Sequence, residues 1–397
     1  EGYYFKAAHD YSGWFRVLAS SPAKAFTRAE IDRHWSYNHE HPVLMKVLFA
    51  GSNGLFHEAL GWMSEISAMR LPGMLMSALG VSLTYLLGVG FCGPTVGWLA
   101  ALFLAGSPRY FYHGQMACFD AGVTTMWLAV ALAWLYREGH HLRLGLVFGL
   151  AIATKHNVLF FPILLFFHWL WIHRERWLTS FRRAQADGAD GFALPVIPWW
   201  VFFMGVIGPL VFLAHWPYLW PDPVGRISWY FGFHLHHEHY PVRYWGESLW
   251  EPPFPRGFPW VMWAMTLSLP LVVTMLGGLF GAFKTLWGDL WWGREPEDGR
   301  TAFIALNLLV PVVLIAAPSV PIFGGTKHWM NALPFGCLLA AQFCQPLVRQ
   351  LMHRHALYGV ALIAGLVAPG VLSTARAHPH GIGAYTELAG GLRGAAS

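Results

Sequence analysis

The chain has 397 residues, of which 55% are hydrophobic and only 12% are charged. A soluble domain carries about a quarter of its residues as charged ones, so this composition excludes an ordinary soluble protein and indicates a polytopic membrane protein. The net charge of +5 does not indicate a nucleic-acid partner, because the basic residues lie between apolar segments rather than in one basic block.

Apolar segments of a length suited to a bilayer recur along the chain and predict an all-α fold with about ten transmembrane helices. We expect a single transmembrane domain over residues 1–397, with a long first outer loop at 1–70 and an outer histidine-rich loop at 218–257. Because the sequence starts with Glu1 rather than methionine, we also expect it to be cut from a longer protein at both ends. The predicted spans are residues 71–91, 94–108, 118–136, 143–154, 157–173, 195–217, 258–283, 301–317, 329–346 and 356–373.

The density of lysine and arginine in the short loops predicts the orientation of these helices. Residues 136–143, 173–191, 288–300 and 349–355 alternate to the same side and are rich in basic residues, so they should be cytoplasmic. Most of the histidines then fall on the outer side. Polar chemistry is therefore expected at one face of the membrane.

Two segments place acidic groups at this outer face. In "YNHEHPVLMK" (37–46), Glu40 and His41 precede a proline that can start a helix, whose N-terminus favours an anion; the alternative is a polar interfacial turn. Asp120 in "SPRYFYHGQMACFDAG" (107–122) begins an otherwise apolar helix. A carboxylate at that depth indicates function, with Arg109 and His113 as candidate partners, unless it only favours the helix dipole.

Two lysine–histidine pairs lie in turns on the same face. Lys155 and His156 stand between two apolar segments, and Lys327 and His328 repeat the pair near the end of the chain. Each lysine could be an interfacial anchor, whereas the two pairs together predict cations that contact a lipid phosphate.

The segment "FHLHHEHYPVRYWGE" (233–247) allows two interpretations. A zinc site needs three or four ligands, and the loop supplies enough histidine nitrogens. The alternative, which we favour, is an anion-binding loop in which Tyr240 and Arg243 contact phosphate or sugar. The candidate metal ligands are His234, His236, His237 and His239.

Several of these motifs together resemble a known enzyme family. An acidic residue at the start of the first outer loop, "EHP" within that loop, "CFD" at a later helix start and the "FGGTK" turn resemble GT-C glycosyltransferases. The nearest group is glycosyltransferase family 39, which includes protein O-mannosyltransferases and the lipid A aminoarabinose transferase. Residues 215–237 resemble bacterial members of this group.

The resemblance implies an enzyme of the inner membrane whose site faces the periplasm. It would transfer a sugar, with inversion, from a polyprenyl-phosphate carrier to an acceptor that is a protein, a lipid or a glycan. Glu1 and Asp120 would be the catalytic carboxylates, and an aspartate is expected just before Glu1. A divalent metal ion is an additional option, since some GT-C enzymes use one. The residues expected to bind the carrier phosphate or the sugar are Glu40, His41, Lys155, His156, Tyr240, Arg243, Lys327 and His328.

Two other function classes stay open at this point. A transporter or flippase for lipid-linked or anionic solutes would place charges at mid-membrane and break paired helices there. An outer-face metalloprotein would use the histidine loop and lose stability when the metal is removed.

Overall fold

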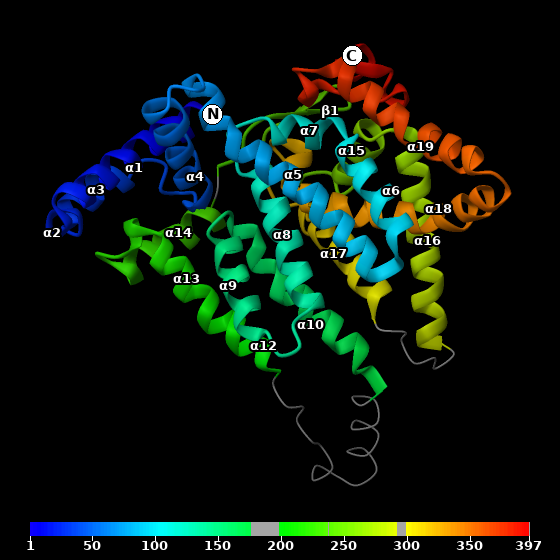
Figure 1. The fold of residues 1–397 in the computed structure, drawn as a ribbon, viewed down its shortest axis with the longest axis horizontal. Coiled ribbons are helices and arrows are strands. Elements are labelled where there is room, and N and C mark those ends of the chain that lie inside the picture. The colour runs from blue at the N-terminus through cyan, green and yellow to red at the C-terminus, as the bar shows by residue number, and fades with distance from the viewer. Residues whose placement is uncertain (176–197, 237, 292–298, 397) are drawn as a thin grey trace, which may run out of the picture.

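The computed structural model describes residues 1–175, 198–236, 238–291 and 299–396. Its described part is mostly helical, with one two-stranded hairpin, so the all-α prediction is confirmed. Figure 1 shows both chain ends at the same end of the molecule, with α10 and α12 at the opposite end.

The segment expected as the first outer loop is itself folded. Thr27 caps α3 by accepting a hydrogen bond from the Glu30 N–H, and Ser64 caps the long helix that follows. Aromatic residues hold the segment together: Tyr11 stacks on Trp35 with their ring centroids 4.0 Å apart. Its elements are α1 (Gly2–Ser20), α2 (Pro22–Ala25), α3 (Arg28–Trp35), α4 (Leu44–Ser52) and the π-helical η1 (Asn53–Ala59).

The apolar helices match the predicted spans closely. Three of those in the described part, α5, α16 and α19, are long and apolar enough by themselves to cross a membrane. The helix α18 has 22 residues but is less apolar, and the other apolar helices are shorter. The first group is α5 (Glu65–Cys92), α6 (Pro94–Ala105), α8 (Asp120–Leu135), α9 (His141–Ile152), the 3-10 turn η2 (His156–Phe160) and α10 (Phe161–Ile172). The second group is α12 (Trp199–Phe202), the π-helical η4 (Phe203–Ile207), α13 (Gly208–His215), α16 (Leu269–Trp291), α17 (Arg300–Ile315), α18 (Leu333–Arg354) and α19 (Ala356–Ala377).

One predicted span is divided in two. Residues 258–283 form α15 (Phe258–Thr266) and the start of α16, with Leu267 in extended backbone between them. Pro270, three residues further on, cannot donate the hydrogen bond to the Thr266 carbonyl that would continue α15. The bend places α15 beside the polar end of the molecule.

The predicted histidine-rich loop contains regular structure. It includes η5 (Pro217–Leu219), α14 (Pro223–Leu235) and an antiparallel hairpin of β1 (Val242–Tyr244) and β2 (Glu247–Leu249). Trp245 and Gly246 have φ values of 50° and 79°, which suits a two-residue hairpin turn.

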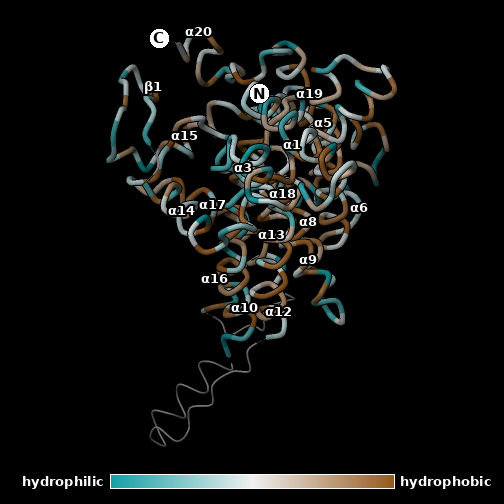
Figure 2. The backbone as a smooth tube through the Cα atoms, turned by 90° about the vertical axis from the view of Figure 1, so that its left-hand side faces the viewer, coloured by the Kyte–Doolittle hydropathy of each residue, from teal (hydrophilic) through white to brown (hydrophobic). Residues whose placement is uncertain are grey.

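Short elements complete the polar end of the molecule. They are α7 (Pro108–Gly114), the 3-10 turns η6 (Gly325–Ala332), η7 (Gly381–Gly383) and η8 (Glu387–Ala389), and α20 (Gly391–Ala396). Figure 2 shows hydrophobic residues concentrated along α10, α12 and α16, whereas the β1 hairpin at the other end is hydrophilic. The molecule therefore has one apolar end and one polar end, and the polar end contains the starts of α7 and α15.

Candidate active site

A buried ion pair joins the start of one helix to the end of another. Asp120, the first residue of α8, lies with its Oδ1 atom 3.0 Å from Nζ of Lys155, in the turn after α9. Its other oxygen is 3.5 Å from Nδ1 of His113 in α7. All three side chains are buried. The structure therefore brings together two predicted site residues and confirms His113 as a neighbour of Asp120.

Backbone contacts explain why the "EHP" segment meets this pair. The N–H of Leu44 donates to the carbonyl of Ala153 at 3.0 Å, which ties the start of α4 to the turn that carries Lys155. Gly122 allows α4 and α8 to approach, because a Cβ there would lie 2.6 Å from Sδ of Met45. These contacts place the 38–44 segment beside the ion pair.

Three histidines from distant parts of the sequence gather next to it. The rings of His156 and His234 lie 4.0 Å apart between centroids, and that of His41 is 6.3 Å from His234. Nε2 of His234 is 2.9 Å from the backbone carbonyl of Glu40. The predicted carrier-binding residues His41 and His156 are thus neighbours through His234, one of the four candidate metal ligands of the histidine-rich loop.

Burial keeps two of the predicted site histidines, His41 and His328, neutral. It lowers the pKa of His41 far below its usual range, and the positive charges of Lys46 and Lys155 add to the effect. Burial also lowers the pKa of His328 to about 3, helped by Lys155 and by Lys327. The positive charge of the site therefore comes from its lysines, and His41 and His328 act as neutral hydrogen-bonding groups.

Glu1 forms a second acidic centre close to the first. Its carboxylate accepts hydrogen bonds from Nε and Nη2 of Arg70 at 2.8 and 2.6 Å and from the N–H of Ala117 at 2.9 Å. Burial raises the pKa of Glu1, but the hydrogen bonds from Arg70 and Ala117 outweigh it, so the net pKa is lowered. Arg70 was missed in the sequence, although a charged residue at the start of an apolar segment was a usable indication.

Other predicted residues lie apart from the ion pair. Tyr240 packs its ring edge against Phe323 with centroids 5.0 Å apart, and Arg243 is exposed on the β1 hairpin. His236 is exposed and bonds to the Gly232 carbonyl of its own helix, and the ring of His239 meets Phe254. The fourth histidine of that predicted metal set, His237, lies outside the described residues.

Over the described ranges, one group of three side chains has the spacing of metal ligands. It consists of His113, Cys118 and Asp120, whose ligand atoms all lie within 4.8 Å of one another. Asp120 already accepts a hydrogen bond from Lys155, so only its second oxygen is available to an ion. The neighbouring ammonium group would repel a metal cation, which makes this a less favourable site than the ligand spacing alone indicates.

A family model matches part of the sequence. The model for dolichyl-phosphate-mannose-protein mannosyltransferase matches residues 40–202, which include the "EHP" segment, Asp120 and Lys155. No curated protein matches the sequence.

Solved structures match the fold over most of the chain. ArnT from Cupriavidus metallidurans bound to undecaprenyl phosphate has a TM-score of 0.50 and 16% identity, over 82% of this chain and 54% of that one. The apo state of the same protein has a TM-score of 0.51 and 15% identity, over 91% and 59%. The apo oligosaccharyltransferase of Archaeoglobus fulgidus has a TM-score of 0.53 and 10% identity, over 84% and 47%.

The chain spans about half the length of these solved proteins. Identities of 10–16% establish a common fold and leave the activity to be argued from the site. The helical architecture, the matched segment and the motifs agree with one another. The chain is therefore an integral membrane protein with the GT-C fold, and its resemblance to glycosyltransferase family 39 is confirmed.

Proposed function

We propose that this protein transfers a sugar, with inversion, from a polyprenyl-phosphate carrier to an acceptor. The family model and the shared fold support glycosyl transfer. The fold relative ArnT is described as bound to undecaprenyl phosphate, which supports a lipid-phosphate carrier for this chain as well.

The observation that carries the proposal is the buried Asp120–Lys155 pair with its surrounding histidines. A carboxylate within hydrogen-bond reach can take the proton that an acceptor hydroxyl loses as it attacks the sugar. The carrier phosphate gains negative charge as its bond to the sugar breaks, and fixed cations in a dry site stabilise that charge. In our proposal Asp120 or Glu1 has the first role, and Lys155 and Lys327 have the second.

The position of the site favours a transferase over a transporter. Asp120 and Lys155 lie at the start of α8 and in the turn after α9, next to the short helix α7 of the polar end, whereas a transporter places its substrate site near the middle of the membrane. Arg137 and Arg143 lie near the opposite ends of α8 and α9. Because basic residues favour the cytoplasmic side, we propose that the site faces the extracytoplasmic side of the inner membrane.

The first experiment measures the thermal unfolding midpoint of the purified 397-residue chain in detergent, with and without undecaprenyl phosphate. A ligand that binds only the folded state raises the midpoint by mass action. We expect undecaprenyl phosphate to raise it for the wild type, and we expect Lys327→Gln to reduce that rise. Lys284→Gln is the matched control, because Lys284 is exposed on α16.

Two outcomes would contradict the carrier proposal. In one, the lipid raises the unfolding midpoint equally in the wild type and in the Lys327→Gln and Lys155→Gln variants, which would mean that it binds elsewhere. The other is no rise with the lipid but a clear loss of stability on adding a chelator, which would favour the metalloprotein alternative.

A further inference from the structure

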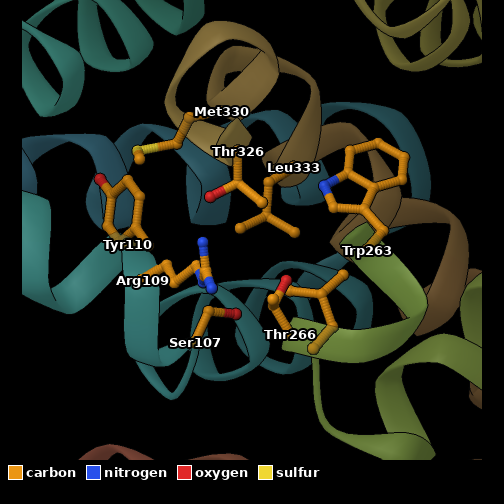
Figure 3. Close-up of a pocket in the computed structure, with 9 residues that line it drawn as sticks. Ser107, Arg109, Tyr110, Trp263, Thr266, Thr326, Met330 and Leu333 are labelled. Atoms are coloured by element: carbon orange, nitrogen blue, oxygen red, sulfur yellow. The ribbon is translucent and has the colours of Figure 1, made fainter. Parts of the chain in front are cut away.

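A small cavity lies at the polar end of the molecule between α7, α15 and η6. Figure 3 shows Arg109 reaching from α7 into this space, with Thr326 and Trp263 on other sides of it. About 20 Å³ of the space can take the centre of a water-sized group, which is room for the tip of a ligand and not for a sugar ring. The lining residues are Ser107, Arg109, Tyr110, Trp263, Thr266, Leu267, Thr326, Met330 and Leu333.

The Arg109 side chain has unused hydrogen-bonding capacity in this cavity. The residue is only 8% exposed, and its Nε and Nη2 atoms have no hydrogen-bond partner. Within the described part of the chain, no carboxylate lies within ion-pair distance of the guanidinium; Asp120 is paired with Lys155 instead. A buried charge without a counter-ion costs several kcal/mol, so the fold alone gives no reason for an arginine here.

The surroundings hold this guanidinium in place without neutralising it. Its Cζ atom lies 4.9 Å from the centroid of the Tyr385 ring, which comes from the C-terminal segment. Thr386 fixes that segment on α15, because its N–H donates to the Met265 carbonyl at 2.8 Å. On the η6 side, the absence of a side chain at Gly325 leaves room next to Nη1 of Arg109. The hydroxyl of Thr326 in the cavity wall also lacks a partner.

We propose that this cavity is a subsite for a single oxyanion group, a carboxylate or a phosphate, held by the Nε–Nη2 edge of Arg109 and by the Thr326 hydroxyl. The two nitrogens form a planar fork that matches two oxygens of an oxyanion. The hydroxyl supplies a third donor. The apolar remainder of the lining, including Trp263 and Leu333, excludes water and strengthens the interaction.

The residues that line the subsite differ from those of the carrier site proposed above, and the two are neighbours, because Thr326 directly precedes Lys327 and Arg109 shares α7 with His113. The anionic group could belong to an acceptor, to a lipid headgroup or to a free ion. These sources share one recognition chemistry and can be distinguished by the probes used.

The test measures the thermal unfolding midpoint of the 397-residue chain with inorganic phosphate or acetate at constant ionic strength, with chloride as the reference. We expect at least one of the two oxyanions to raise the midpoint of the wild type relative to chloride. Arg109→Lys keeps the charge but loses the fork, so it should weaken the apparent affinity about tenfold, the loss of roughly one charge-assisted hydrogen bond. Arg256→Lys, at an exposed arginine just before α15, is the matched control and should respond as the wild type does.

Thr326→Val provides a second test that keeps Arg109 and the fold. It should weaken the response to the same oxyanion without abolishing it. The proposal is overturned if neither oxyanion shifts the wild type, or if Arg109→Lys and Thr326→Val both respond as the wild type does.

Undecaprenyl phosphate identifies the source of the anion. If Arg109→Lys loses the stabilisation by this lipid while Lys327→Gln keeps it, the lipid phosphate occupies the Arg109 subsite and the carrier site proposed above is wrong. If Lys327→Gln loses the stabilisation by the lipid and Arg109→Lys loses only the stabilisation by phosphate or acetate, the results support both proposed sites.

Discussion

Lys46 is a residue whose importance only the folded chain reveals. It follows the "NHEHP" motif and lies in α4, fully buried, with its Nζ atom donating to the backbone carbonyls of Asn38 and His41 at 2.7 and 2.9 Å. It therefore fixes the loop that presents His41 to the site. Burial lowers the pKa of Lys46 from its usual 10.5 to about 7.

This lowered pKa predicts that the free energy of unfolding depends on pH. Between about pH 7 and 10.5 the unfolded chain binds a proton at Lys46 that the folded chain does not, so stability rises with pH across this window. Below pH 7 both states bind the proton and the burial penalty is complete. The expected slope is about 1.4 kcal/mol per pH unit at most.

The measurement is the unfolding midpoint from pH 6 to 10 for the wild type and Lys46→Met. In the variant, the unfolding midpoint should rise much less between pH 7 and 10 than it does in the wild type. Lys284→Met, at an exposed lysine, should keep the wild-type rise. Parallel curves for the wild type and Lys46→Met would show that Lys46 stays protonated in the folded protein.

The Asp120–Lys155 pair makes a second prediction at the residue scale. Asp120→Asn leaves the ammonium of Lys155 buried with a weaker partner, which should cost about 3–5 kcal/mol of unfolding free energy. Replacing both residues in Asp120→Asn with Lys155→Met should cost less than the single change, because no buried charge is left unpaired. A double-mutant cycle on the purified chain measures this coupling. If the losses of unfolding free energy in the two single variants add up to the loss in the double variant, the two charges do not interact.

The sequence allowed part of this site to be predicted at the level of single residues. Asp120 and Lys155 were identifiable because charged groups beside apolar segments are costly and need a role. The Glu1–Arg70 pair was not, because its partners lie 69 positions apart in the sequence and only the tertiary fold brings Glu1 to Arg70 in α5. The sequence groups His234 with the other histidines of the loop, whereas α14 directs it toward Glu40 and His156.

At the scale of elements, the hydrophobic segments predicted where the apolar helices lie, but not where a predicted span is divided into two helices. Nearly every predicted span coincides with a helix or a short series of helices. The bend between α15 and α16 depends on Pro270 and on the packing of α15 over η6, and the helices of residues 1–59 depend on aromatic contacts such as Tyr11–Trp35. Average hydropathy does not contain this information.

The contact between α16 and α18 provides the prediction at this scale. A Cβ at Gly278 would lie 2.2 Å from the carbonyl oxygen of Leu339, so the two helices can approach only with glycine at this position. Gly278→Ala should lower the unfolding free energy by about 1–3 kcal/mol. Thermal unfolding in detergent measures the change.

The control lies one turn further along the same helix. Nothing is within 4 Å of a Cβ at Gly281, so Gly281→Ala should be neutral or slightly stabilising through its helix propensity. Equal effects of the two substitutions would contradict a close contact at Gly278.

At the scale of the whole molecule, both chain ends and the hairpin lie at one polar end (Figure 1). The proposed sidedness can be tested with two exposed glutamates, Glu138 after α8 and Glu251 after β2. We expect a membrane-impermeant thiol reagent added to intact cells to label Glu251→Cys and to label Glu138→Cys only after the membrane is permeabilised.

The wild type measures the background labelling of its four native cysteines, which are buried or partly buried. The reverse pattern would place the site on the cytoplasmic side and overturn that part of the proposal.

The sequence by itself determined the membrane class, the helical fold and the resemblance to family 39, because these follow from apolar segment length and from short local motifs. It also identified Asp120 and Lys155 as chemically active candidates. Only the tertiary structure decided which groups meet: Asp120 with Lys155, Glu1 with Arg70, His156 with His234, and Arg109 with a cavity instead of with Asp120. The physical reason is that ion pairs and cavities form between helices, and their partners depend on helix packing rather than on distance along the chain.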